Sequence, residues 1–270
     1  MGDGGLKMKL GLTMWDSKTG SQLVINKAYV DYVSEAAPSY EPIIITPANN
    51  IDQMADLCDG LILPGGIDID PIFYDEENIA SYTTDPARDD FERHVFYAFV
   101  QRNKPVFGIC RGFQLILREF LKDRKKTYSS YFTFYQHISN HSLATDLSIS
   151  RCNPSHSVHA LRNILYGEEY NKTVRMYVNS MHHQGVIVNF GNSKNTTIKD
   201  ITVSAMTRYG MNKKETGFIV EAYKINGWST GGIEAVQWHP EELKDYGLIT
   251  SFFNDNNAEE ENQNALDLNL

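Results

Sequence analysis

The first half of this sequence alternates short apolar runs with helix-length segments, and this alternation restricts the fold more than any other feature. The apolar runs are brief and are bounded by glycine, proline or polar residues, which is typical of buried parallel strands. We expect four such strands at Lys9–Met14, Ile43–Thr46, Gly60–Leu63 and Pro105–Ile109. This alternation predicts an α/β fold with a mainly parallel sheet and helices on both of its faces.

Two of the helices between these runs have clear start signals. Asn26 can cap a helix that places Tyr29, Val30 and Val33 on one apolar face. Asp85 can cap a longer helix that the chain enters through Pro86.

The second half of the chain is richer in strands. Apolar runs separated by turn residues predict strands at Val174–Asn179, Gly185–Asn189, Thr202–Met206, Phe218–Tyr223 and Ile233–Trp238. A final helix is expected over Glu241–Phe253. Without an internal repeat or a Pro/Gly-rich linker, we expect one domain over residues 9–253, a flexible N-terminus at 1–8 and a disordered acidic tail at 254–270.

Composition excludes several functional classes. The 270 residues carry 25 Lys+Arg and 34 Asp+Glu, a formal charge of −9, which argues against a nucleic-acid binder. No apolar run approaches the roughly 20 residues that span a bilayer, so no membrane partner is expected. Three cysteines, an odd number, fit a reducing cytoplasm better than a disulfide framework.

The clearest chemical signal is the segment Gly108–Gly112, which joins an apolar strand to a helix. Small residues on both sides of a nucleophile permit the tight turn that lifts its side chain clear of the sheet. The following helix N-terminus favours a thiolate, the reactive form of cysteine. We therefore expect Cys110 to be a nucleophile and Cys58 and Cys152 to be packing residues.

A base and an oxyanion site are also indicated. His239 ends another apolar strand, and Glu241 follows two residues later, so the pair can take up a thiol proton and hold the ring in one tautomer. The Pro64–Gly66 turn lets the backbone approach a ligand, with N–H groups free to face an oxyanion. The N–H of Arg111, the residue after the nucleophile, would be the second donor.

Four segments, in this order, resemble the class I glutamine amidotransferase-like superfamily: CDGLILPGGIDIDP, DPARDDFE, PVFGICRGFQL and GGIEAVQWHPEE. Two more, Pro154–Val158 (PSHSV) and Val178–Val186 (VNSMHHQGV), resemble its γ-glutamyl-γ-aminobutyrate hydrolase branch among the γ-glutamyl hydrolases. The resemblance runs from about Lys9 to Phe253. It implies a single Rossmann-like (flavodoxin-like) domain with no metal or redox cofactor.

The resemblance also implies a reaction and a set of site residues. A Cys110–His239–Glu241 triad would cleave a γ-glutamyl amide through a glutamyl thioester and release glutamate and an amine. The N–H groups of Gly66 and Arg111 would form the oxyanion hole. Residues matched to the substrate pocket are Gly65, Gln114, Ser180, His182, His183 and Gln184. Asp85 and Arg88 match the family's DPxRD signature, for which helix capping and loop fixing are roles at least as well supported as substrate contact.

Two segments depart from the family pattern. LKDRKKTYSSYFTF follows the elbow helix where relatives carry a Gly-Gly-x-Leu turn, and residues 189–199 look like a remodelled loop. Within Leu121–Ser142 we expect the basic run to be a solvated helix end and the aromatics to pack as a strand or cover. Because both segments could border the amine half of the substrate, the identity of that amine stays open.

Metal catalysis is a rival interpretation, because the eight histidines include His137/His141, His156/His159 and His182/His183. Zinc sites usually combine tight ligand pairs with surrounding carboxylates. These pairs instead fall in expected loops or strands, where adjacent side chains would point opposite ways. We therefore expect no metal and no cofactor.

Two other functions stay open. The first is a glutaminase subunit that delivers ammonia to a separate synthetase partner. The second is a non-catalytic binding protein on the same fold, against which the joint retention of Cys110, His239 and Glu241 argues. We expect a small-molecule γ-glutamyl substrate, and the sequence leaves open a synthetase partner or a homodimer.

Overall fold

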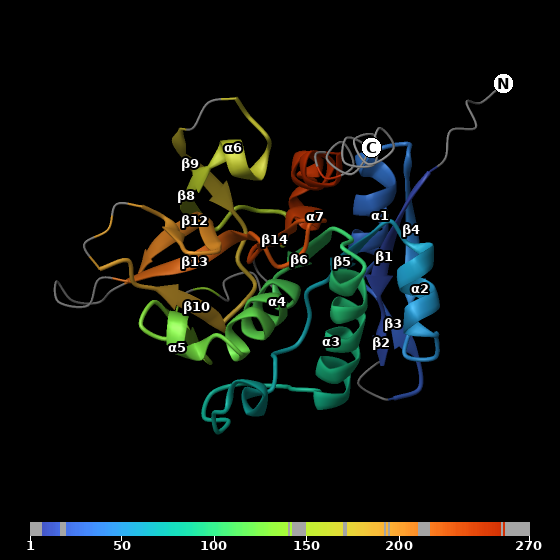
Figure 1. Ribbon diagram of the computed structural model, residues 1–270, viewed down its shortest axis with the longest axis horizontal. Helices are drawn as coiled ribbons and strands as arrows, with labels where there is room; N and C mark the ends of the chain where they lie inside the picture. The colour runs from blue at the N-terminus through green and yellow to red at the C-terminus, as the bar shows by residue number, and fades with distance from the viewer. Residues whose placement is uncertain are drawn as a thin grey trace, which may run out of the picture.

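Parallel strands form one half of the central sheet, in the order β4-β1-β5-β6-β14 (Figure 1). The computed structural model describes residues 7–16, 20–139, 141, 150–169, 172–191, 193, 195–209, 217–254 and 256. The parallel strands are β1 (Met8–Thr13), β4 (Tyr40–Ile45), β5 (Gly60–Leu63), β6 (Val106–Ile109) and β14 (Ile233–Val236). The four strands expected in the first half are therefore confirmed.

Strands from the second half continue the same sheet in antiparallel fashion. From β14 outward the order is β13, β12, β8 and β9, and β10 joins β13 to β7. Their bounds are β7 (Phe132–Tyr135), β8 (His156–Leu161), β9 (Thr173–Val178), β10 (Gly185–Val188), β11 (Thr197–Ile198), β12 (Ile201–Tyr209) and β13 (Gly217–Ile225). A separate small ribbon pairs β2 (Trp15–Asp16) with β3 (Leu23–Val24). The expected α/β fold with extra C-terminal strands is confirmed, although the sequence patterns did not predict β8.

Helices cover both faces of the parallel half, each over its own apolar core. On one face α2 (Ile51–Leu57), α3 (Pro86–Gln101) and α4 (Arg111–Lys122) pack through a cluster that includes Phe96, Phe99, Phe113 and Ile116. On the other face α1 (Lys27–Ala36) and the helical residues 246–254 share a cluster with Tyr32, Val33, Phe252 and Phe253. Shorter helices are η1 (Pro71–Tyr74), α5 (Lys125–Tyr128), α6 (Arg162–Leu165) and α7 (Pro240–Leu243).

Both expected helix caps are present, but the final helix is interrupted. Asn26 accepts a hydrogen bond from the N–H of Ala28, and Asp85 accepts from two N–H groups of α3. The expectation of one helix over Glu241–Phe253 was wrong. Lys244 has a left-handed conformation (φ 55°), which ends α7 before a second helix begins.

The expected terminal segments fall mostly outside the described residues. Residues 1–6, 255 and 257–270 are not among those described, and Met8, which we expected to be flexible, begins β1. The domain limits 9–253 therefore remain a prediction. No helix in the described part of the chain is long and apolar enough to cross a membrane.

The basic segment after α4 and the two other cysteines can now be placed. Lys122 and Lys125 are exposed around the junction of α4 and α5, and the aromatics that follow form β7, as expected. Burial raises the pKa of the Cys58 thiol to about 11, which fits its packing role. Cys152 is exposed, so the expectation that it packs was wrong.

Candidate active site

The three motifs identified in the sequence meet at one edge of the sheet. β5, β6 and β14 are adjacent and parallel, and their carboxyl ends lead into Gly65, Cys110 and His239 respectively. Sites in open α/β sheets form at this edge because the ends of parallel strands converge there. Segments that lie far apart in the chain therefore supply one site.

Cys110 occupies a strained turn between β6 and α4. Its φ is 51° and its ψ is −99°, and its N–H donates to the carbonyl of Val236 at 2.8 Å. Such a conformation in a residue other than glycine costs about 1–3 kcal/mol and is found mainly at functional sites. A Cβ on Gly112 would lie 2.2 Å from the carbonyl oxygen of Leu63, so this close approach requires glycine.

His239 lies between a carboxylate and the cysteine. Its Nδ1 is 2.7 Å from Oε1 of Glu241, and Cys110, His239 and Glu241 are all buried. Burial alone would lower the pKa of His239, but the Glu241 carboxylate and Cys110 outweigh it and raise the pKa to about 10. The ring therefore keeps its proton at neutral pH, in the form that can protonate a leaving group.

The backbone groups expected to bind an oxyanion flank this pair. Arg111 is the first residue of α4, so its N–H has no acceptor within the helix. Gly65 is buried against the site, where an added Cβ would lie 2.7 Å from Cε1 of His239 and 3.3 Å from Cβ of Cys110. Gly66, the next residue, is exposed. The Gly65 N–H already donates to the Tyr29 hydroxyl, and the oxyanion hole expected from the N–H groups of Gly66 and Arg111 remains a prediction.

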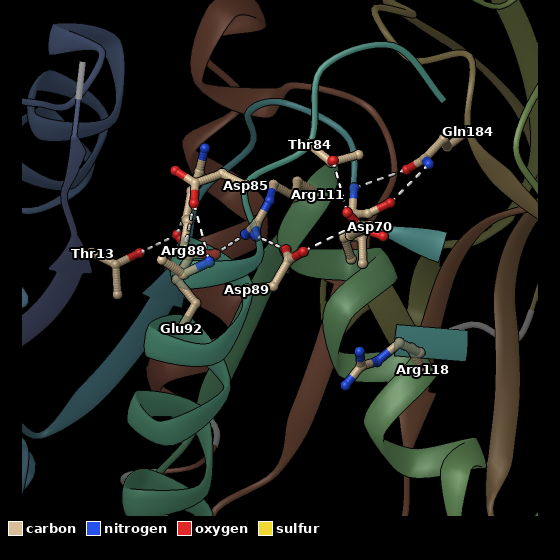
Figure 2. Close-up of polar contacts among 12 residues, drawn as sticks. Thr13, Asp70, Thr84, Asp85, Arg88, Asp89, Glu92, Arg111, Arg118 and Gln184 are labelled. Atoms are coloured by element: carbon tan, nitrogen blue, oxygen red, sulfur yellow. Dashed lines mark hydrogen bonds and ion pairs between the residues drawn. The ribbon is translucent and has the colours of Figure 1, made fainter. Parts of the chain in front are cut away.

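The Arg111 side chain is part of a buried ionic network beneath the elbow. Its guanidinium pairs with Asp89 and Glu92, both on α3 (Figure 2). Glu92 also accepts hydrogen bonds from Thr13 and Arg88, at 3.0 and 3.1 Å. Burial lowers the pKa of Arg88 and of Arg111 to about 9, so both remain charged at neutral pH. The network fixes the start of α4, and with it the elbow, against α3.

Arg88 explains the DPARD segment. Its guanidinium donates to the carbonyl oxygen of Gly65 at 3.0 Å and lies 3.5 Å from the ring centre of Trp15. Asp85 caps the same helix (Figure 2). The segment thus caps a helix and fixes the glycine loop, the roles that we weighed against substrate contact.

The residues matched to a substrate pocket mostly bond to one another and to nearby loops. Gln184 pairs with the backbone of Ile69 through two bonds of 3.1 Å, and Gln114 donates to the carbonyl of Gln184 at 3.0 Å. Nε2 of His183 is 2.7 Å from Oδ2 of Asp68, and the Ser180 hydroxyl donates a hydrogen bond to the carbonyl oxygen of His141. Within the described part of the chain, none of these four side chains, nor that of His182, makes a hydrogen bond to Cys110, His239 or Glu241. Their substrate role therefore remains a prediction.

Sequence reasoning missed two residues that touch the site. The Tyr29 hydroxyl accepts a hydrogen bond from the N–H of Gly65 at 2.9 Å and lies 3.3 Å from Nδ1 of His239. Asn179 accepts from the N–H of His239 at 2.8 Å and donates to the His239 carbonyl at 3.0 Å. Tyr29 was visible only as part of an apolar helix face. Asn179 lay inside the VNSMHHQGV segment without a signal of its own.

One set of side chains outside the triad has the composition of a metal site. His141, His156 and Glu221 offer ligand atoms that all lie within 4.8 Å of one another. His141 and His156 belong to two different histidine pairs of the sequence. His182, from the third pair, lies beside His141. Burial lowers the pKa of His182 to about 4, so this ring is neutral at neutral pH.

A cysteine at a strand–helix elbow beside a His–Glu pair, on this sheet, is the arrangement expected from the resemblance to the glutamine amidotransferase-like superfamily. The model of the peptidase C26 family matches residues 5–241, so the chain belongs to this hydrolase family.

Relatives of known sequence agree with this family. A glutamine amidotransferase-like protein of Rickettsia prowazekii is 29% identical over 78% of this chain and 81% of its own length. The γ-glutamyl-γ-aminobutyrate hydrolase PuuD of Escherichia coli is 23% identical over 85% of this chain and 83% of its own length.

Solved structures confirm the fold. A GMP synthase subunit from Thermoplasma acidophilum superposes with a TM-score of 0.51 at 14% identity, covering 96% of this chain and 98% of that one. The glutaminase domain of Trypanosoma brucei CTPS, with bound acivicin, gives a TM-score of 0.51 at 15% identity, covering 93% and 94%. The flavodoxin-like fold expected from the sequence is therefore confirmed.

Proposed function

We propose that this protein is a thiol hydrolase that cleaves the γ-glutamyl amide of a small amine or amino acid. The proposal rests on one observation above all. The strained Cys110 lies at the N-terminus of α4, beside Gly65 and a buried His239 that is hydrogen-bonded to Glu241. This arrangement combines a nucleophile, an acid–base group and backbone donors, which acyl transfer requires together.

The reaction would proceed in two halves. The Cys110 sulfur attacks the γ-carbonyl carbon, and the N–H groups of Gly66 and Arg111 stabilise the resulting oxyanion. His239 gives its proton to the amine nitrogen as the carbon–nitrogen bond breaks, which leaves a glutamyl thioester. His239 then takes a proton from water, the water oxygen attacks the thioester carbonyl, and the carbon–sulfur bond breaks. This releases glutamate and returns the Cys110 sulfur and the protonated His239 to their starting state. Glu241 holds the ring in the tautomer that permits both transfers.

Each half of the substrate can be assigned to a region of the chain. The glutamyl half would lie near Gly65 and Gln114, which match the family's pocket. The amine half would lie toward the segments in which this chain departs from the family pattern. The nucleophile must stay reduced, and the cysteines of the described residues are all free thiols, which suits a cytoplasmic enzyme.

A glutaminase activity that feeds a synthetase partner is the second candidate. The observation that favours it is the 29% identity to a protein named glutamine amidotransferase-like, against 23% to PuuD. In that case glutamine itself would be the γ-glutamyl amide and ammonia the leaving group, with the same residues in the same roles.

The test is a panel of γ-glutamyl amides, with free glutamine included, incubated with the purified full-length chain. Released amine and glutamate are measured by mass spectrometry. Replacing Cys110 with Ala should reduce turnover by at least about 10³-fold. The matched control is Cys152→Ala, which removes an exposed thiol and should leave turnover unchanged.

Three results are informative. Amine release from a γ-glutamyl amine that Cys110→Ala abolishes supports the hydrolase. Turnover of glutamine alone, and only with a partner protein present, would replace it with the glutaminase subunit. Unchanged turnover in Cys110→Ala, with the variant folded by circular dichroism, would exclude thiol catalysis at this position.

A further inference from the structure

A second cluster of polar side chains gathers where the antiparallel strands meet the loops beside them. His156 lies on β8 and Glu221 on β13, while His141 comes from the connection between β7 and β8. Nε2 of His156 is 2.9 Å from Oε1 of Glu221, and Nε2 of His141 is 3.8 Å from the same oxygen. Ligand atoms around a tetrahedral zinc ion, with bonds of about 2.0–2.1 Å, lie roughly 3.4 Å apart. The distances of 2.9 and 3.8 Å from the Glu221 oxygen to the two histidine nitrogens lie on either side of this separation.

Several buried atoms of this cluster lack the partners that such atoms normally have. Among the residues that the structure describes, Nε2 of His141, Nδ1 of His156, Nε2 of His182 and Oε2 of Glu221 are buried and make no hydrogen bond. Glu221 is fully buried and His182 is 5% exposed. Nearly all buried polar side-chain atoms in proteins have a partner, so several unpaired atoms within one cluster indicate a missing ligand.

The other ring nitrogens show how two of these histidines are oriented. Nδ1 of His141 lies 3.1 Å from the carbonyl oxygen of Ser139, and Nδ1 of His182 lies 2.9 Å from that of Gln184. Because a carbonyl oxygen only accepts, each Nδ1 carries the hydrogen and each Nε2 carries a lone pair. Metal-bound histidines are held in this way, with the distal N–H donated to a carbonyl or carboxylate.

We propose that His141, His156 and Glu221 bind a divalent transition metal of the zinc type, with His182 as the fourth ligand. Imidazole nitrogens with one carboxylate suit zinc and its neighbours, whereas calcium and magnesium prefer oxygen ligands alone. His182 lies next to this group, since its ring centroid is 5.4 Å from that of His141, and the His156 centroid is 5.1 Å from that of His141. One carboxylate and neutral imidazoles balance half of the charge of a divalent ion.

This metal would be structural, because four protein ligands would leave no open position, whereas a catalytic metal keeps one. Glu221 and His182 are buried, and the side chains of His141 and His156 are 14% and 18% exposed. It would join the connection before β8 and the segment around residue 182 to the sheet. The second of these segments includes Asn179, which holds the backbone of His239. The N–H of Gln237, two residues before His239, donates to the carbonyl of Glu221 at 2.7 Å. The metal would thus brace the strand end that carries the catalytic base.

The sequence led us to expect no metal, because the spacing within each histidine pair was unsuitable. In the folded chain, the two histidines of each sequence pair separate. His141, His156 and His182 enter the cluster, whereas His183 points away to Asp68, and His137 lies 3.3 Å from His183. The ligands therefore come from different pairs, an arrangement that spacing along the chain does not reveal.

The first test measures metal bound to the full-length chain, purified without chelators or an affinity tag that binds metal. After dialysis against zinc and removal of the excess, inductively coupled plasma mass spectrometry should find about one zinc ion per chain. Stripped protein titrated with Co²⁺ should develop saturable visible bands typical of four-coordinate nitrogen and oxygen ligation. The same measurements on Cys110→Ala exclude the thiol as the ligand.

Matched variants on one strand locate the site. His156→Gln should weaken Co²⁺ binding by more than about tenfold and abolish the rise in melting temperature that zinc gives the unaltered chain. His159→Gln is the control, since His159 is exposed on the same strand and should bind as the unaltered chain does. Because these readouts do not involve catalysis, they stand whether or not the proposed hydrolase activity is found.

Two outcomes would overturn the proposal. The first is less than about 0.1 zinc per chain together with no saturable Co²⁺ band, which would mean that water fills the cluster. The second is metal binding that His156→Gln leaves unchanged but Cys110→Ala removes, which would place the metal at the thiol. If His156→Gln does not fold, the stoichiometry and spectrum of Cys110→Ala decide the question alone.

Discussion

The two halves of the sheet hold their polar side chains in different ways. In the parallel half, the strand ends of β5, β6 and β14 place Gly65, Cys110 and His239 at one edge. In the antiparallel half, His156 and Glu221 project from within β8 and β13 and meet His141 from a connecting segment.

This difference has a topological cause. Parallel strands joined by right-handed crossovers bring every carboxyl end to the same edge, so residues just after a strand converge automatically. Antiparallel strands alternate in direction, and a cluster forms only where register and bulges happen to bring side chains together. β12 and β13, for example, shift register between Val203 and Met206. A catalytic group is therefore easier to locate in the first half than a ligand cluster in the second.

The largest effect is expected at the carboxylate of the parallel half. Glu241→Gln removes the negative charge that orients His239 and should lower kcat by about 10²–10⁴-fold. Steady-state kinetics on the best γ-glutamyl amide measures this. Glu242→Gln is the matched control, because Glu242 is the next residue but contacts Arg151 at 2.6 Å instead of the triad. Equal losses in the two variants would contradict a specific role for Glu241.

The His239–Glu241 pair also makes the stability of the folded protein depend on pH. The pKa of His239 is raised from its ordinary 6.5 to about 10, so the folded state binds the additional proton between these values. The stabilisation is complete below pH 6.5 and is lost as pH rises through 10. Urea unfolding should therefore show the largest difference between the unaltered chain and Glu241→Gln below pH 6.5. A difference that grows toward pH 10 would reverse this assignment.

A smaller but still large effect is expected in the ionic network under the elbow. Arg111→Met leaves Asp89 without its partner inside the protein and should lower the free energy of unfolding by about 3–5 kcal/mol. Arg102→Met is the control, because Arg102 pairs at the surface with Asp52 and Asp56 and such pairs contribute little. Chemical denaturation of both variants measures the contrast. Similar losses would mean that the buried network does not hold the parallel half together.

The smallest expected effect tests whether the antiparallel half supports the triad. Asn179→Ala removes two hydrogen bonds to the peptide groups of His239 and should reduce kcat by about 10–100-fold, equivalent to about 1–3 kcal/mol. Asn189→Ala is the control, since Asn189 is exposed and its side chain accepts from the N–H of Gly191 in a surface loop rather than from the site. An Asn179→Ala enzyme with full kcat would show that the two halves act independently.

Sequence patterns alone determined much of this protein. Short apolar runs and helix caps predicted the parallel strands, α1 and α3, because burial and capping act over a few residues. The elbow could be located because its geometry demands glycine at positions fixed relative to Cys110. His239 and Glu241 could be paired because they are only two residues apart.

Tertiary structure alone decided which distant side chains meet. Tyr29 appeared in the sequence as one more apolar residue of a helix, yet its hydroxyl bonds to the glycine loop. Asn179 and Glu221 had no distinguishing pattern, and the left-handed turn at Lys244 that interrupts the last helix had no glycine to mark it. Local propensity acts between neighbours in the chain, whereas these contacts depend on the packing of segments that the sequence separates by tens to hundreds of residues.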